Sequence, residues 1–183
     1  MEVALSAERQ KLRWWSGRLT DVFRLEHPSC EADPTITRLR PFEIERQPWL
    51  RPLYERAGGY PWDLLAWEAQ ATGRFGILRL IAAFPAPPDQ RPRVFCPDGP
   101  PAPDHRYDAL ELCLYYPDDP PERCWTLDQG LLGLFDMGRV HLAAEELCRV
   151  DDKPWAIDEA PHGDTAPAVA DPSLRLAPLG ERL

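Results

Sequence analysis

The stretch LLAWEAQATGRFGILRLIAAF, at residues 64–84, reads as two β-strands joined by a short turn. The strands are expected at 65–70 and 75–81, where apolar side chains dominate. Residues 71–74 between them are small or polar and include a glycine, as a turn between strands requires. The segment therefore predicts an antiparallel hairpin.

Further strands are expected on the C-terminal side of this hairpin. Residues 92–96, PRVFC, form a short run bounded by prolines, and residues 110–116 form an apolar run that carries Cys113. Residues 97–104 lie between the two runs and are rich in proline, which cannot donate hydrogen bonds to a sheet. We expect two short strands separated by irregular chain.

Helices are expected on both sides of the strands. The first is predicted at residues 6–23 and is expected to end at His27-Pro28. The second is predicted from Thr126 or Asp128 to Arg149. Its apolar stripe is expected to be buried and consists of Leu127, Leu131, Leu134, Val140 with Met137 beside it, Ala144 and Leu147.

Residues 30–62 leave alternatives open. Weak alternation at 35–44 allows a strand, and residues 49–57 allow a short helix before Gly58-Gly59. The order of helix, strands, irregular chain and helix predicts an α+β fold. The segment 164–183 is rich in Pro and Ala without periodicity, which predicts a flexible tail after a domain at 1–163.

The composition indicates one folded globular domain. The chain has 183 residues, a hydrophobic fraction of 44% and seven tryptophans. Its net charge of −9 argues against partners that need a basic surface, namely nucleic acid and anionic membranes. It has no apolar run near the ~20 residues that span a bilayer, and no signal-peptide core. We therefore expect a cytoplasmic protein whose five cysteines are thiols.

Cys113 is the candidate for chemistry, because a thiolate is a strong nucleophile and can carry an acyl group as a thioester. Strand alternation is expected to turn it away from the core that Leu112 and Leu114 enter, at a sheet margin or on a flap. His105 could return beside it if residues 106–110 form a turn, and an imidazole there could stabilise the thiolate. The alternative is a buried, inert thiol, since unpaired cysteines are often buried.

An ordered set of motifs surrounds Cys113. It begins with FPAPPDQRPRVFCPD at 84–98 and continues with His105 and with LCLYYP at 112–117. Trp125, His141, Trp155 and APHG at 160–163 follow. This order resembles the core of ubiquitin-conjugating enzymes, and it is most similar to bacterial relatives found in antiphage signalling and ubiquitin-like conjugation operons. The resemblance covers roughly residues 64–163.

The resemblance implies a ubiquitin-conjugating fold and a transthioesterification mechanism. Cys113 would accept the C-terminal carboxyl group of a ubiquitin-like protein, or of another protein, from an activating enzyme and pass it to an amine on a protein target. His105 would be its neighbour in the site. No metal or organic cofactor would be needed.

One motif residue of the family is absent. The Asn that holds the oxyanion in family members has no counterpart, because Arg106 and Tyr107 follow His105. Either residue, or a backbone N–H, is a candidate substitute. The other candidate supporting residues are Asp118, which could orient an incoming lysine, and His141 and His162.

Two rival functions remain open on the sequence. The first is a catalytically inactive protein-binding module on the same fold. The second is a zinc-stabilised structural protein using His105, Cys113, His141 and Cys148, although paired spacing such as Cys-x-x-Cys is missing. Cys124 is either a resolving thiol or a packing residue, and Cys96 is expected in the core.

Overall fold

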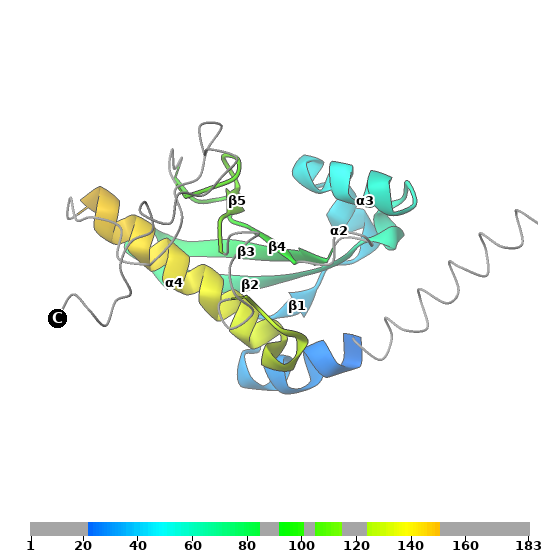
Figure 1. Cartoon of the computed structure of the whole chain (residues 1–183), viewed down its shortest axis with the longest axis horizontal. Coiled ribbons are helices and arrows are strands. Elements are labelled where there is room, and N and C mark those ends of the chain that lie inside the picture. Colours follow the sequence, from blue (N-terminus) through cyan, green and yellow to red (C-terminus); the bar gives the residue numbers. More distant parts are fainter. Residues whose placement is uncertain (1–21, 85–91, 101–104, 115–123, 151–183) are drawn as a thin grey trace, which may run out of the picture.

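Within the residues that the structure describes, five strands form one antiparallel sheet in the order β1-β2-β3-β4-β5 (Figure 1). The computed structural model describes residues 22–84, 92–100, 105–114 and 124–150. Strands β2 (Leu65–Gly73) and β3 (Gly76–Phe84) pair along their full length. The predicted hairpin is confirmed, and its turn is tighter than expected because residues 71–73 continue the first strand.

The shorter strands flank this hairpin. Strand β1 (Thr37–Arg38) pairs with β2 on one side, and β4 (Arg93–Phe95) pairs with β3 on the other. Strand β5 (Glu111–Leu112) pairs with β4 and is the last strand in the sheet order, at its edge. The strand expected at 92–96 is confirmed, and the apolar run at 110–116 supplies an edge strand that ends immediately before Cys113.

Short helices fill the connection between β1 and β2. They are α2 (Pro41–Glu45), the 3₁₀ turn η1 (Pro48–Leu50), α3 (Arg51–Ala57) and the 3₁₀ turn η2 (Pro61–Asp63). The helix expected at 49–57 is confirmed. The strand considered for 35–44 is limited to β1, because Pro41 favours the first position of a helix. The Glu43 carboxylate also accepts a hydrogen bond from the Arg40 N–H, at 2.7 Å. This bond satisfies the backbone donor at the N-cap of α2.

The N-terminal helix extends further than the sequence predicted. Residues 22–32 are helical, so the expected end at His27-Pro28 is wrong. Tertiary contacts outweigh the proline here. Leu25 is buried in the core, and the Ser29 hydroxyl accepts a hydrogen bond from the Leu132 N–H at 3.0 Å. The predicted residues 6–21 lie outside the described part of the chain.

The long C-terminal helix begins where it was expected. The turn η4 (Leu127–Gln129) leads into α4 (Gly130–Val150), and the Gln129 side chain accepts a hydrogen bond from the Thr126 N–H at 2.8 Å. Gly130 joins the two at φ 63° and ψ −169°, a conformation essentially restricted to glycine. A Cβ at this position would also lie 2.7 Å from Ser29 Oγ.

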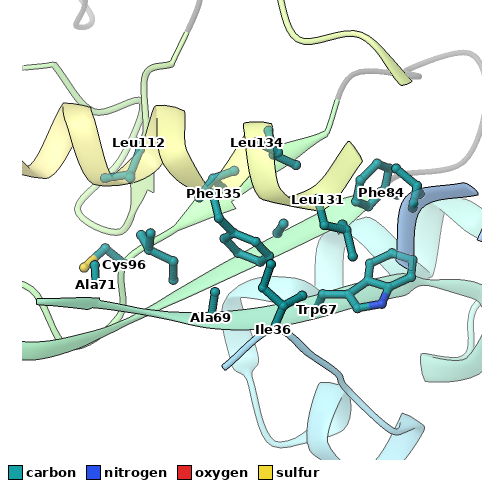
Figure 2. Packing of buried hydrophobic residues seen from close by; sticks show 14 of the residues in the cluster. Ile36, Trp67, Ala69, Ala71, Phe84, Cys96, Leu112, Leu131, Leu134 and Phe135 are labelled. Carbon is teal, nitrogen blue, oxygen red and sulfur yellow. The ribbon is translucent and has the colours of Figure 1, made fainter. Parts of the chain in front are cut away.

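Strand alternation divides the apolar side chains between two cores, one on each face of the sheet. The first, which we call the α4-side core, lies between the sheet, α4 and the helix at 22–32 (Figures 1 and 2). The second, the α3-side core, lies under α2, η1 and α3 on the opposite face. Members of the α4-side core include Trp67, Leu80, Val94, Leu112, Leu131, Leu134 and Phe135, and members of the α3-side core include Ile44, Leu50, Leu53, Ala66, Ile81 and Phe95.

The buried face of α4 differs in part from the predicted stripe. Leu131, Leu134 and Ala144 are buried as expected, whereas Val140 is 57% exposed. The buried face of α4 also includes Phe135, His141 and Glu145. Because two of these residues are polar, the apolar pattern of the sequence did not reveal the whole face. The domain is α+β, as predicted. No helix among the described residues is long and apolar enough to cross a membrane.

Candidate functional site

Residues 105–113 form a small hairpin that ends at Cys113. The Cys113 N–H donates to the His105 carbonyl at 3.1 Å, and the Tyr107 N–H donates to the Glu111 carbonyl at 3.1 Å. The Asp108 carboxylate turns the chain by accepting from the N–H groups of Leu110 and Glu111, both at 2.8 Å. The turn considered for 106–110 is therefore present, and it brings the His105 backbone beside Cys113.

Cys113 is buried, with 0% of its surface exposed. Leu112 belongs to the α4-side core, so alternation turns the next residue toward the opposite face, as expected. Neither of the two cores defined by the described residues includes Cys113. Of the two positions expected for this run, the structure has the sheet margin, since β5 is the edge strand. The thiol there is fully buried, which agrees with the alternative of a buried cysteine.

His105 has an unusual backbone conformation. Its φ is 61°, the left-handed region, and it is the one non-glycine residue with positive φ among those described. Such a conformation costs on the order of 1–3 kcal/mol and persists where surrounding contacts impose it. Here the hydrogen bond that the His105 carbonyl accepts from Cys113 is such a contact.

Arg106 forms a buried ion pair with Glu145 of α4. Its Nε and Nη2 atoms lie 2.8 Å from the two Glu145 carboxylate oxygens, and its Nη1 donates to the Ala109 carbonyl at 2.7 Å. Both residues are only 4% or less exposed. Arg106 pairs with Leu112 across the hairpin, so both side chains face α4, the face opposite to that of Cys113. The guanidinium is thus occupied by Glu145 and the Ala109 carbonyl.

His141 completes a buried polar cluster with Glu145. Its Nε2 lies 3.3 Å from Glu145 Oε1, one helical turn away, and it is 1% exposed. Burial alone would raise the pKa of Glu145, but hydrogen bonds from His141 and Arg106 and the Arg106 charge hold that pKa below its usual range. Glu145 is therefore a buried carboxylate in its charged form.

Cys96 lies close to this cluster. A Cβ on Gly99 would be 2.8 Å from Cys96 Sγ and 3.1 Å from Arg106 Nη2, so the two side chains face the same glycine. Burial raises the pKa of the Cys96 thiol to about 11, and the Arg106 charge opposes this rise only in part. Cys96 is fully buried, as predicted, and is held as a neutral thiol.

This pKa predicts a loss of stability at high pH. Because the thiol pKa is raised on folding, its contribution is complete below the ordinary thiol pKa and is lost as pH rises through about 11. We expect Cys96 to account for a loss on the order of 2 kcal/mol between about pH 8 and about pH 11. Urea unfolding at the two pH values measures it. Cys96→Ala should remove this part of the pH dependence and Cys124→Ala should not, and an equal loss in wild type and Cys96→Ala would contradict the assignment.

A second ion pair anchors β5 to β4. The Glu111 carboxylate, which is buried, accepts two hydrogen bonds from the Arg93 guanidinium, one of them at 2.6 Å from Arg93 Nε. The Leu110 carbonyl also accepts from the Cys96 N–H at 2.8 Å.

Tyr107, a candidate supporting residue, lies on the hairpin and is 46% exposed.

The other predicted site residues are divided between described and undescribed chain. His141 lies against Glu145, whereas Asp118 and His162 lie outside the described residues. Within the described ranges, no group of three or more His, Cys, Asp or Glu side chains is placed to hold a metal. The zinc alternative therefore finds no ligand set there.

Sequence reasoning missed two buried carboxylates, Glu111 in the hairpin and Glu145, which binds the hairpin from α4. Glu145 follows His141 by four residues, which places both on one face of a helix. That spacing, next to the buried Ala144, was the available signal. Glu111 carries no such signal, because its burial depends on Arg93 from another strand.

Comparisons with protein-family models, with curated proteins and with solved structures find no match to this chain.

Proposed function

We propose that this protein is a cysteine-dependent acyl carrier and transferase that resembles ubiquitin-conjugating enzymes. In the proposal, Cys113 holds the C-terminal acyl group of a ubiquitin-like or other protein as a thioester and passes it to an amine on a protein target. The observation that supports it best is the hairpin that joins His105 to Cys113 at the sheet edge, with 3.1 Å between the Cys113 N and His105 O atoms. Two residues of the motif order, His105 and Cys113, are thus adjacent in space, which supports the proposal.

The proposed reaction has two acyl transfers. The Cys113 thiolate attacks the carbonyl carbon of the donor thioester, a new C–S bond forms, and the donor's C–S bond breaks to release its thiolate, which takes up the proton lost by Cys113. An amine then attacks the new thioester. A C–N bond forms, the C–S bond to Cys113 breaks, and the proton lost by the amine restores the thiol. No electrons are exchanged, so no oxidant or cofactor is required.

The side chains near the hairpin have different parts in this proposal. His105 is the neighbour that favours the thiolate, and Tyr107 or a backbone N–H supplies the oxyanion contact for which Asn is missing. Arg106 is assigned to positioning rather than to the oxyanion, because its guanidinium binds Glu145 on the opposite face. Asp118 and His162 keep the supporting roles that the resemblance gives them.

One feature of the chain fits the proposal's setting, and another places a requirement on it. All five cysteines lie in the described residues and none is joined in a disulfide, which suits a reducing compartment such as the cytoplasm. Cys113 is fully buried, so the proposal requires that donor binding expose it. The partners are then an activating enzyme, the acyl-donor protein and a protein target, with neither nucleic acid nor membrane involved.

Thioester formation tests the proposal. The protein is mixed with an activating enzyme encoded beside it, the ubiquitin-like partner and ATP, and adducts are separated by mass with and without a thiol reductant. Wild type should give an adduct that the reductant cleaves, and Cys113→Ala should abolish it because the acceptor sulfur is gone. Cys30→Ala is the matched control, since it removes a partly buried thiol on another element, and it should keep the adduct. An adduct that survives in Cys113→Ala would contradict the assignment.

A second function is supported by the burial of Cys113. A fully buried thiol, with Arg106 committed to Glu145, also fits a protein-binding module on which the cysteine has no chemical part. In that case wild type should bind the partner proteins without forming an adduct. Cys113→Ala should then bind them with unchanged affinity.

A further inference from the structure

We propose that Arg106 and Glu145 are positioning residues, whose buried ion pair fixes the hairpin at 105–113 to α4 and keeps Cys113 in its covered position. The relevance of this pair to acyl transfer rests on the proposed function. Its effect on Cys113 can be measured without any acyl donor.

The contacts of Arg106 link the hairpin at 105–113 to α4. Two guanidinium nitrogens contact Glu145 on α4 at 2.8 Å each, and the third donates to the Ala109 carbonyl in the turn of the hairpin at 2.7 Å. A planar guanidinium holds a carboxylate in one orientation through paired hydrogen bonds. The hairpin turn and the helix are therefore held in a defined relation by one side chain.

A backbone link connects the pair to Cys113. Arg106 and Leu112 are directly opposed in the hairpin and face α4, while Cys113 follows Leu112 and faces the other way. The Cys113 N–H is bonded to the residue before Arg106, at the His105 carbonyl. A shift of Arg106 away from α4 would therefore move both segments that flank the thiol.

Stability alone is a poor explanation for this pair. A buried ion pair must overcome the desolvation of both charges, and apolar residues of similar size often serve the fold equally well. The same helix carries a second ion pair, between Arg139 and Asp33, which does not touch the hairpin. The Arg139–Asp33 pair provides a comparison, because substitution of Arg139 also removes a guanidinium that binds a carboxylate at α4.

Alkylation of the intact protein by iodoacetamide tests the inference. The rate at Cys113 is followed by peptide mass mapping, with Cys30 on the helix at 22–32 as the internal reference. Arg106→Met should raise the Cys113 rate at least about tenfold relative to Cys30, because the hairpin then opens locally without global unfolding. Arg139→Met should leave the Cys113 rate itself near its wild-type value; the ratio is not used for this variant, because Arg139 pairs with Asp33, whose charge acts on the reference Cys30.

Two further variants keep the test decisive. Arg106→Lys retains the charge but loses the paired geometry, and it should give an intermediate rise if Arg106→Met does not fold. Exchanging the charges, Arg106→Glu with Glu145→Arg, should restore part of the protection that Arg106→Glu alone removes. An unchanged Cys113 rate in a folded Arg106 variant, or an equal rise in Arg139→Met, would overturn the inference. Both outcomes are read without donor protein, so they are independent of whether a thioester forms.

Discussion

Arg106→Met is expected to lower the free energy of unfolding by about 3–5 kcal/mol, because it leaves the Glu145 carboxylate buried without its main countercharge. Glu145 is 4% exposed, so water cannot replace the lost guanidinium. The double variant Arg106→Met with Glu145→Met removes both charges together and should recover most of that loss. The large effect of Arg106→Met thus comes from leaving the Glu145 charge buried and unpaired, and not from a large net contribution of the ion pair to stability.

Urea unfolding of the single and double variants measures this difference. Arg79→Met is the control, since it breaks the Arg79–Asp98 pair, whose side chains are 41% and 44% exposed. Solvent screening limits the cost of losing an exposed pair to at most ~1 kcal/mol. A double variant as unstable as Arg106→Met would mean that packing, rather than charge, dominates at this position.

Phe135→Ala is expected to destabilise the fold by about 3–5 kcal/mol, the usual range for removing a buried aromatic side chain. The ring is fully buried, and Figure 2 shows it between α4 and the sheet, directed toward Ile36. Its loss leaves a cavity at the point where α4 crosses the strands. The neighbouring elements meet there from three sides and cannot close the space without shifting.

Val140→Ala on the same helix is the matched control for Phe135→Ala. Val140 is 57% exposed, so its truncation should change the stability by no more than ~0.5 kcal/mol. Thermal or urea unfolding of the two variants compares a buried and an exposed position on one helix. A similar loss of stability in the two variants would show that α4 packs on the sheet through a different face.

The elements that local patterns predict well are those whose side chains repeat with a clear period. The hairpin at 65–84 is of this kind. The start of α4 after Thr126 was predicted from a capping residue instead, which is also a local signal. The helix at 22–32 passes Pro28 because Leu25 and Ser29 gain contacts with distant residues, which no local pattern contains. The strand considered at 35–44 is cut short by Pro41, and this proline was visible in the sequence.

The candidate site divides in the same way. Amino-acid order alone pointed to Cys113 as the candidate, gave a sheet margin as one of its two possible positions and allowed a turn that returns His105 to it. These inferences depend on residues only eight positions apart. Only the tertiary structure decided that the thiol is covered and that Arg106 binds Glu145, thirty-nine positions away. Burial and ion pairing between distant segments arise when the sheet and α4 come together, and the free energy that governs them belongs to that packing rather than to any local run of residues.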